Sequence, residues 1–169
     1  MTEVMKNYIH WLRDAHAMEQ QAEQMLKAQA SRIEHYPELE ARITQHIRET
    51  QGQRELLETC FGRLGEKPSV VKDVMGRLAA FGQAVGGSVA SDEVVKGAMA
   101  GYVFETLEIA TYTTLIAAAE AAGDAETARV CRGILKQEEE MAQWLLEHLP
   151  SITTQFLARD ADPDAVAKR

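Results

Sequence analysis

Apolar side chains recur every three or four residues along four long stretches of the chain, the spacing that predicts amphipathic α-helices. The first stretch runs from about residue 4 to residue 33. Pro37 breaks the pattern and suits the first turn of a second helix, from about residue 37 to residue 64. Gly65 and the residues after it end the second helix. The chain therefore opens with two long helices joined by a short link.

A third and a fourth helix follow in the second half of the chain. The third helix has a capped and acid-rich start at Ser91-Asp92-Glu93, and Gly123 ends it. Asp124 caps the fourth helix, which runs to about residue 148. Pro150 is then expected to open a short C-terminal helix. The pattern therefore predicts an all-α protein with four long helices.

The connection between the second and third predicted helices is long, spanning about residues 65–90. It carries a helical pattern of its own over about residues 69–84, followed by a glycine-rich loop. A short link makes neighbouring helices antiparallel, whereas a long crossover lets the second and third helices run parallel, as in ferritin-like bundles. We therefore predict one ferritin-like four-helix bundle over residues 1–159, with an extra helix in the crossover. Residues 160–169 are predicted to form a polar, disordered tail.

Composition narrows the classes of function. At 169 residues the chain suits one domain, and its net charge of −8 argues against binding to nucleic acid or anionic lipid, which require basic patches. The N-terminus has no apolar core of the signal-peptide kind, and no stretch approaches a membrane span. We therefore expect a soluble, cytoplasmic protein. Cys60 and Cys131 form no CxxC motif and are expected to be ordinary buried thiols.

Glutamates on the apolar faces are the candidate chemistry. Glu105 and Glu108 stand three residues apart, so both carboxylates lie on one face of the third helix, among small, apolar and aromatic residues. Two such carboxylates repel each other and are costly to bury ionised, so either they tilt to solvent or a cation neutralises them. Ferritin-like bundles hold di-iron or di-manganese pairs with glutamates from four helices, because two hard dications require several anionic oxygen ligands. The glutamates on the four interior stripes are Glu19, Glu49, Glu105, Glu108 and Glu138.

The sequence departs from the usual metal motif, in which two helices each supply Glu-x-x-His. Residue 52, three after Glu49, is glycine, and residue 141, three after Glu138, is methionine. His46 instead precedes Glu49 by three residues, so the order is inverted. This histidine is either a metal ligand or an interior residue that bonds a carboxylate.

Two further polar residues lie near the predicted site. Gln53 either adds an amide oxygen to the ligands or orients one of them. Tyr112, one turn beyond Glu108, is either a packed tyrosine with a satisfied hydroxyl or a redox-active neighbour of the metals.

Several segments resemble the YciE/YciF-like family of bacterial proteins, and the likeness spans nearly the whole chain, nearer the YciE branch. They are LRDAHAME (12–19), HIRETQGQ (46–53), FETLEIATY (104–112) and the glutamate at 138 followed by MAQWL (141–145). The resemblance implies a ferritin-like bundle, a homodimer, a link to stress responses and rubrerythrin-like acidic residues around a metal pair. By that likeness the five glutamates are candidate ligands, and His46 and Gln53 match the pattern too.

The leading hypothesis is a stress-related protein that binds two divalent metal ions in the bundle core, with iron first and manganese as the alternative. If it is an enzyme, its reaction class is oxidation of Fe(II) by dioxygen or peroxide, or peroxide removal. The second hypothesis is a non-enzymatic dimeric helical protein whose acidic interior is a structural or vestigial metal site, acting through partners. A third is an iron-storage cage. Apolar residues of the crossover, such as Val71 and Phe81, are candidates for a dimer contact.

Overall fold

Four long α-helices make up the computed structural model, which describes residues 1–68, 76 and 91–164. The described residues contain no strand. The helices are α1 (Glu3–Ala30), α2 (Pro37–Leu64), α4 (Glu93–Ala121) and α5 (Ala125–Asp160). The expected crossover helix and its apolar residues Val71 and Phe81 lie outside the described residues, as does the end of the predicted tail.

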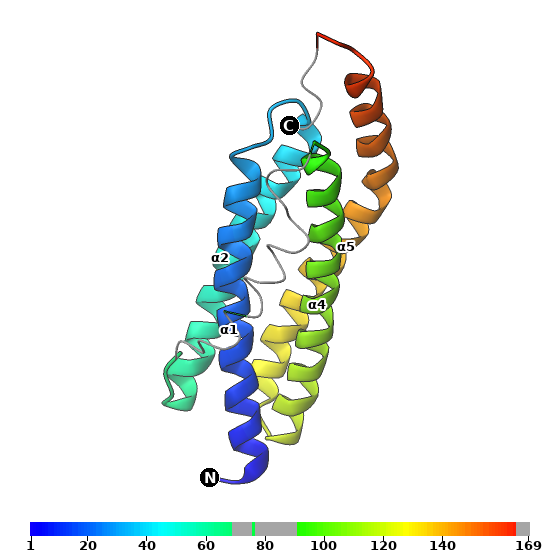
Figure 1. Cartoon of the computed structure of the whole chain (residues 1–169). Coiled ribbons are helices and arrows are strands. Elements are labelled where there is room, and N and C mark those ends of the chain that lie inside the picture. The colour runs from blue at the N-terminus through cyan, green and yellow to red at the C-terminus, as the bar shows by residue number, and fades with distance from the viewer. Residues whose placement is uncertain (69–75, 77–90, 165–169) are drawn as a thin grey trace.

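The helix directions confirm the predicted fold class. Figure 1 shows α1 and α5 running one way along the bundle, and α2 and α4 running the other way. α1 packs against α2 and α4, and α5 packs against α4 and α2. Because α2 and α4 are parallel, the connection from Leu64 to Glu93 joins opposite ends of the bundle. This is the topology of a ferritin-like bundle with a central crossover.

Most helix ends lie where the sequence predicts them. Pro37 opens α2, and Gly65, with a φ of 68°, caps its C-terminus in the left-handed region that glycine favours. Gly123 adopts a φ of 79° after α4 for the same reason. The expected side-chain cap at Asp92 is not formed, because its carboxylate pairs with Lys96 at 2.9 Å instead.

The expected separate C-terminal helix is instead the last part of α5, which continues through Pro150 to Asp160. Proline lacks an N–H and therefore removes a helical hydrogen bond. Burial beyond the proline compensates for this loss, since Ile152 and Phe156 both pack into the core. The Gln155 side chain also donates to the backbone carbonyl of His35 at 2.8 Å.

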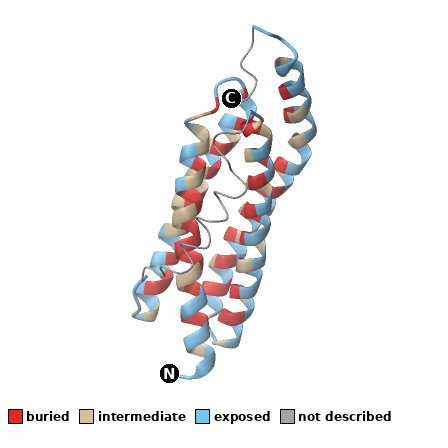
Figure 2. Ribbon diagram, in the orientation of Figure 1, coloured by how far each residue is buried: buried red, intermediate tan, exposed pale blue. Residues whose placement is uncertain are grey.

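A layer of polar side chains interrupts the apolar core. Figure 2 shows the buried residues on the inner faces of the helices and the exposed residues on the outside. On α5, the buried Glu138 lies between Ile134 of one apolar cluster and Met141 of another. On α2, the buried His46 and Gln53 interrupt the apolar stripe in the same way. We call this the polar layer, formed by Glu19, His46, Gln53, Glu105, Glu108 and Glu138.

One aspartate, Asp124, connects three helices at the end of the bundle opposite the start of α4. Asp124 accepts hydrogen bonds from the backbone N–H of Thr127 at 3.0 Å, from the Tyr8 hydroxyl at 2.8 Å and from Arg63 at 2.9 Å. These donors belong to α5, α1 and α2. Burial would raise the pKa of Asp124, but its donors outweigh that effect and lower it to about 2.

Replacing Asp124 by alanine is expected to lower the free energy of unfolding by about 3 kcal/mol, since it removes an N-cap and leaves the buried Tyr8 hydroxyl without its acceptor. Urea denaturation followed by circular dichroism measures this. Asp124→Asn keeps an acceptor oxygen and is expected to lose less than half as much. A loss below 1 kcal/mol for the alanine variant would mean that the three helices are held by apolar packing alone.

Candidate metal centre

Four side chains from three helices converge in the polar layer. His46 comes from α2, Glu105 and Glu108 from α4, and Glu138 from α5, and all four are buried. Each offers one ligand atom, and these atoms all lie within 4.8 Å of one another. The three-residue spacing of Glu105 and Glu108 places both on the inner face of α4, as the sequence predicts.

The converging atoms lack hydrogen-bond partners. Among the described residues, none is found for Nε2 of His46, Oε2 of Glu105, Oε1 of Glu108 or Oε2 of Glu138. Nε2 of His46 lies 3.2 Å from Glu105 Oε2 and 3.3 Å from Glu138 Oε2, close enough for an ion pair but without hydrogen-bond geometry. A buried polar atom without a partner costs about 1–3 kcal/mol, so several at one point need an explanation. Carboxylate oxygens and one imidazole nitrogen are ligands that iron and manganese accept, and these residues therefore fit a bound cation.

Glu19 of α1 is fully buried and is not one of these four residues, but the charges of Glu138, His46 and Glu105 act on it, so it lies near them. The hydroxyl of Tyr112 donates a hydrogen bond to its Oε1, whereas its Oε2 has no partner among the described residues. The structure thus gives Tyr112 a satisfied hydroxyl, and it leaves one Glu19 oxygen available to a cation.

Glu49 is separated from the cluster by the ring of His46. Its Oε2 lies 2.7 Å from Nδ1 of His46, whereas the cluster faces the opposite ring nitrogen. Arg42 and Gln45 also bond Glu49, at 3.1 and 2.8 Å. The Glu49 side chain is 17% exposed, in contrast to the buried carboxylates. The structure therefore places Glu49 on the Nδ1 side of the His46 ring, away from the other glutamates.

Gln53 covers one side of the cluster. Its amide nitrogen donates to Oε1 of Glu138 and, at 2.9 Å, to Oε1 of Gln137. Its own Oε1 is buried and has no partner among the described residues. The donation to Glu138 fits the prediction that Gln53 orients a carboxylate.

Burial and mutual repulsion raise the pKa of three of the buried carboxyl groups, Glu19, Glu108 and Glu138. Burial first, and then the charge of Glu138, raise the pKa of Glu19 and of Glu108 well above the usual range. Burial also raises the pKa of Glu138 to about 7. A cation among these groups would replace the protons and relieve the repulsion, so cation binding is linked to proton release.

The pKa values of His46 and of its hydrogen-bond partner Glu49 shift in opposite directions. Burial alone would lower the pKa of His46, but the charge of Glu105 and the close contacts with Glu105, Glu138 and Glu49 raise it well above its usual value. The hydrogen bond from His46 lowers the pKa of Glu49 to about 2. Glu49 is therefore ionised at neutral pH and holds the imidazole ring through Nδ1, which leaves Nε2 to face the cluster.

Three residues that support the site are not predicted from the sequence. Arg42 and Gln45 precede Glu49 by seven and four residues, a helical spacing that would have signalled their contact with it. Gln137 receives the Gln53 amide across the bundle. No local pattern indicates that pairing, because the two residues lie on different helices.

The bundle topology and the buried carboxylate layer define a ferritin-like helical protein. Residues 3–158 match the family described as a domain of unknown function, DUF892, and the chain belongs to this family. A protein of Xanthomonas campestris pv. campestris, known from its crystal structure, is similar to it with 42% identity and a TM-score of 0.81. That match covers 95% of this chain and 100% of the Xanthomonas chain.

Two more distant solved structures share the fold. The E. coli stress protein YciF is 22% identical with a TM-score of 0.75, and the match covers 88% of this chain and 96% of YciF. A dodecameric thioferritin from Bacteroides fragilis is 19% identical with a TM-score of 0.72. That match covers 90% of this chain and 89% of the thioferritin chain. The match to the DUF892 family over residues 3–158 confirms the predicted YciE/YciF-like family, and these likenesses confirm the ferritin-like fold, while placement in the YciE branch stays a prediction. Within the described residues, no helix combines the length and apolarity needed to cross a bilayer.

Proposed function

We propose that this protein binds two divalent cations in the polar layer of its bundle. Iron is the first candidate for these cations, and manganese is the alternative. The observation that carries the proposal is the convergence of four buried side chains that can ligate a metal, each of which has one atom without a hydrogen-bond partner among the described residues. His46, Glu105, Glu108 and Glu138 would hold the ions, with the unpartnered oxygen of Glu19 as a fifth ligand. Two ions would share these ligands through bridging carboxylates, as in other ferritin-like bundles.

The surrounding residues keep these ligands in place. Tyr112 holds Oε1 of Glu19, and Gln53 holds Oε1 of Glu138, so each carboxylate turns its other oxygen to the site. Glu49, which the sequence offers as a ligand, acts in this proposal through Nδ1 of His46. An iron pair bound here would supply oxidation of Fe(II) by dioxygen or peroxide. We further propose a cytoplasmic homodimer with a stress-related role, in keeping with the family resemblance.

A second candidate function is a structural cation site without oxygen chemistry. The observation that favours it is the ligand set itself, which has a single histidine and no Glu-x-x-His. An oxygen-rich set accepts manganese or a redox-inactive cation nearly as well as iron. In this case the protein acts through partners, and the cation stabilises the bundle.

Metal analysis of protein purified without chelator or affinity metal tests the proposal, followed by anaerobic Fe(II) titration and oxygen-electrode measurements. We expect about two ions per chain at saturation and oxygen uptake that depends on Fe(II). Saturation without oxygen uptake would favour the structural site. Folded protein that takes up neither Fe(II) nor Mn(II) would remove the cation site altogether.

Size-exclusion chromatography with light scattering tests the proposed assembly. We expect about twice the mass of one chain. A mass near twelve chains would instead match the dodecamer of the Bacteroides fragilis thioferritin, and would favour the iron-storage hypothesis.

A further inference from the structure

A groove of about 640 Å³ opens on the outside of the bundle between α2 and α5. Its lining comes mainly from α2 and includes Arg48, Glu49, Gly52 and Gln53, with Gln137 from α5. Of the four pairs of adjacent helices, α2 and α5 pack least closely in the described structure. The groove therefore follows from the way the helices are arranged, and it lies directly outside the polar layer.

Gly52 keeps the middle of this groove open. A Cβ atom at this position would meet no atom within 4 Å in the described structure, so the backbone of α2 is bare there. The residue is in a helix interior, where glycine is about 1 kcal/mol less favourable than alanine. It is also the position at which a Glu-x-x-His motif would carry histidine. This chain thus carries no side chain at that position of the sequence.

The Gln53 side chain lies between the groove and the cluster. Its side chain lines the groove, yet it is buried, and its amide nitrogen bonds both Gln137 and Glu138. Rotation of this one amide would break both hydrogen bonds, one of which holds Glu138. The unpartnered Oε1 of Gln53 is an oxygen ligand of the kind that a hard cation accepts in passing.

The neighbouring α1–α2 seam is closed by polar contacts. One turn beyond Glu19, Glu23 bonds Lys27, and across the seam it bonds Gln51 and Arg54. On the inner side, the Tyr112 hydroxyl covers Glu19 itself. A cation entering by this seam would meet the positive charges of Lys27 and Arg54, whereas the α2–α5 groove has one positive charge, Arg48, in its lining and the amides of Gln137 and Gln53 before Glu138.

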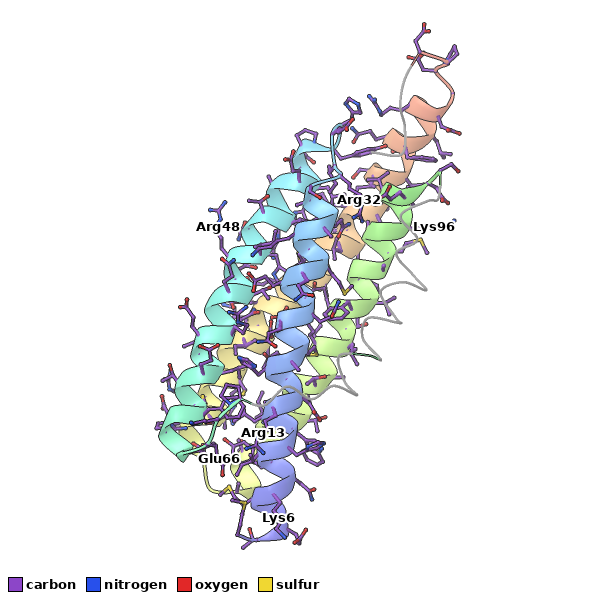
Figure 3. All side chains as sticks on the ribbon, turned by 60° about the vertical axis from the view of Figure 1, so that its left-hand side comes forward. Lys6, Arg13, Arg32, Arg48, Glu66 and Lys96 are labelled. Atoms are coloured by element: carbon purple, nitrogen blue, oxygen red, sulfur yellow. The ribbon has the colours of Figure 1, made fainter. Side chains whose placement is uncertain are left out.

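We propose that divalent cations reach the cluster through the α2–α5 groove, with Gln53 as the gate. The carboxylate of Glu49, partly exposed at the groove, attracts the cation, and Gln137 and Gln53 offer it amide oxygens on the way to Glu138. Arg48, which points outward from α2 (Figure 3), opposes entry by its charge. This inference rests on the proposed function, since it assigns the entry route of the same site.

Filling the groove tests the route. Gly52→Leu places a branched side chain in the open space, leaves every proposed ligand unchanged and raises helix propensity. The matched control is Gly62→Leu, the same substitution on the same helix at an exposed position outside the groove lining. The probe is Co(II) added to metal-free protein, followed in a stopped-flow instrument by its visible absorption, with equilibrium occupancy measured separately by dialysis.

We expect Gly52→Leu to slow Co(II) uptake at least tenfold at unchanged final occupancy, and Gly62→Leu to load at the rate of the unmodified protein. Gly52→Leu that loads at the unmodified rate would overturn the route and leave the proposed function standing. Unmodified protein that binds no Co(II) at equilibrium would overturn both.

A second variant is expected to increase the rate of Co(II) uptake. Arg48→Gln removes the positive charge at the groove and is expected to speed Co(II) uptake two- to threefold at low ionic strength, with the gain lost in high salt. If Gly52→Leu fails to fold, this variant decides the matter. An uptake rate that does not respond to Arg48→Gln at any salt concentration would then overturn the route.

Discussion

Glu108→Gln is expected to abolish tight binding of divalent cations while making the metal-free protein more stable at pH 8. Glu108 is buried, and the charges that act on it most strongly are those of three other carboxyl groups, Glu138, Glu19 and Glu105. Its Oε1 has no partner among the described residues. A neutral amide of the same shape removes this repulsion but is a far weaker ligand for a hard cation.

The two effects have opposite signs, which separates a ligand from a residue that only supports the fold. Replacing buried ionic groups by neutral residues of similar volume is often neutral or stabilising by roughly 1–4 kcal/mol, and we expect a gain at the lower end of this range for metal-free Glu108→Gln. Isothermal titration with Mn(II) measures the loss of binding, and urea denaturation of metal-free protein measures the gain in stability. Glu139→Gln, which changes an exposed glutamate of α5, is the control and should leave both unchanged.

Glu105→Ala is expected to lose the metal as well, without the same gain in stability. Glu105 faces His46 at 3.2 Å, so its removal takes away a favourable contact together with the repulsion. If Glu108→Gln or Glu105→Ala bound Mn(II) as tightly as the unmodified protein, the assignment of the cluster as the metal site would be wrong.

The thermal stability of the metal-free protein is expected to fall as the pH rises from 5 to 8. Burial raises the pKa of Glu138 from 4.5 to about 7 in the folded state, so folding favours its protonated form. The stabilisation is therefore complete below pH 4.5 and is lost as the pH rises through about 7. The raised pKa values of Glu19 and Glu108 act in the same direction.

His46 adds to this trend, because its raised pKa contributes stability below its unfolded value of 6.5 that is lost as the pH rises through its folded value. Glu49 and Asp124 behave oppositely, since their pKa values are lowered to about 2. Their contribution is complete above their ordinary values near 4 and is lost only in stronger acid. The window from pH 5 to 8 therefore reports the buried cluster.

The size of the effect follows from Glu138 alone. A pKa change from 4.5 to about 7 corresponds to about 3 kcal/mol, and hence to a decrease in melting temperature of roughly 6–12 °C for a chain of this length. Differential scanning calorimetry of metal-free protein at pH 5, 6, 7 and 8 measures it. Saturating Mn(II) is expected to reverse the trend, because binding to the deprotonated cluster strengthens with pH. A melting temperature of metal-free protein that rises steadily from pH 5 to 8 would show that the cluster carries no extra protons.

Local patterns were sufficient for the helices and for some of the site. The left-handed glycines at 65 and 123, Pro37 at the start of α2 and the Asp124 cap of α5 act within a few residues, so their effects can be read along the chain. The pairing of Glu105 with Glu108 follows from helix geometry in the same way, and the structure places both in one buried cluster. The continuation of α5 through Pro150 could not be predicted, because it depends on burial of Ile152 and Phe156 against other helices.

By itself, the sequence determined that this protein is a ferritin-like bundle with carboxylates on its inner faces, because helical periodicity and loop length are properties of the chain. Only the tertiary structure decided which residues of α2 face the cluster. His46 and Glu49 stand three residues apart, and therefore about 60° apart around the helix axis. The periodic pattern allows either side chain to face the bundle interior. The packing of α2 against α1 and α5 turns His46 inward, so Glu49 lies on the outer side of the His46 ring, at the edge of the groove.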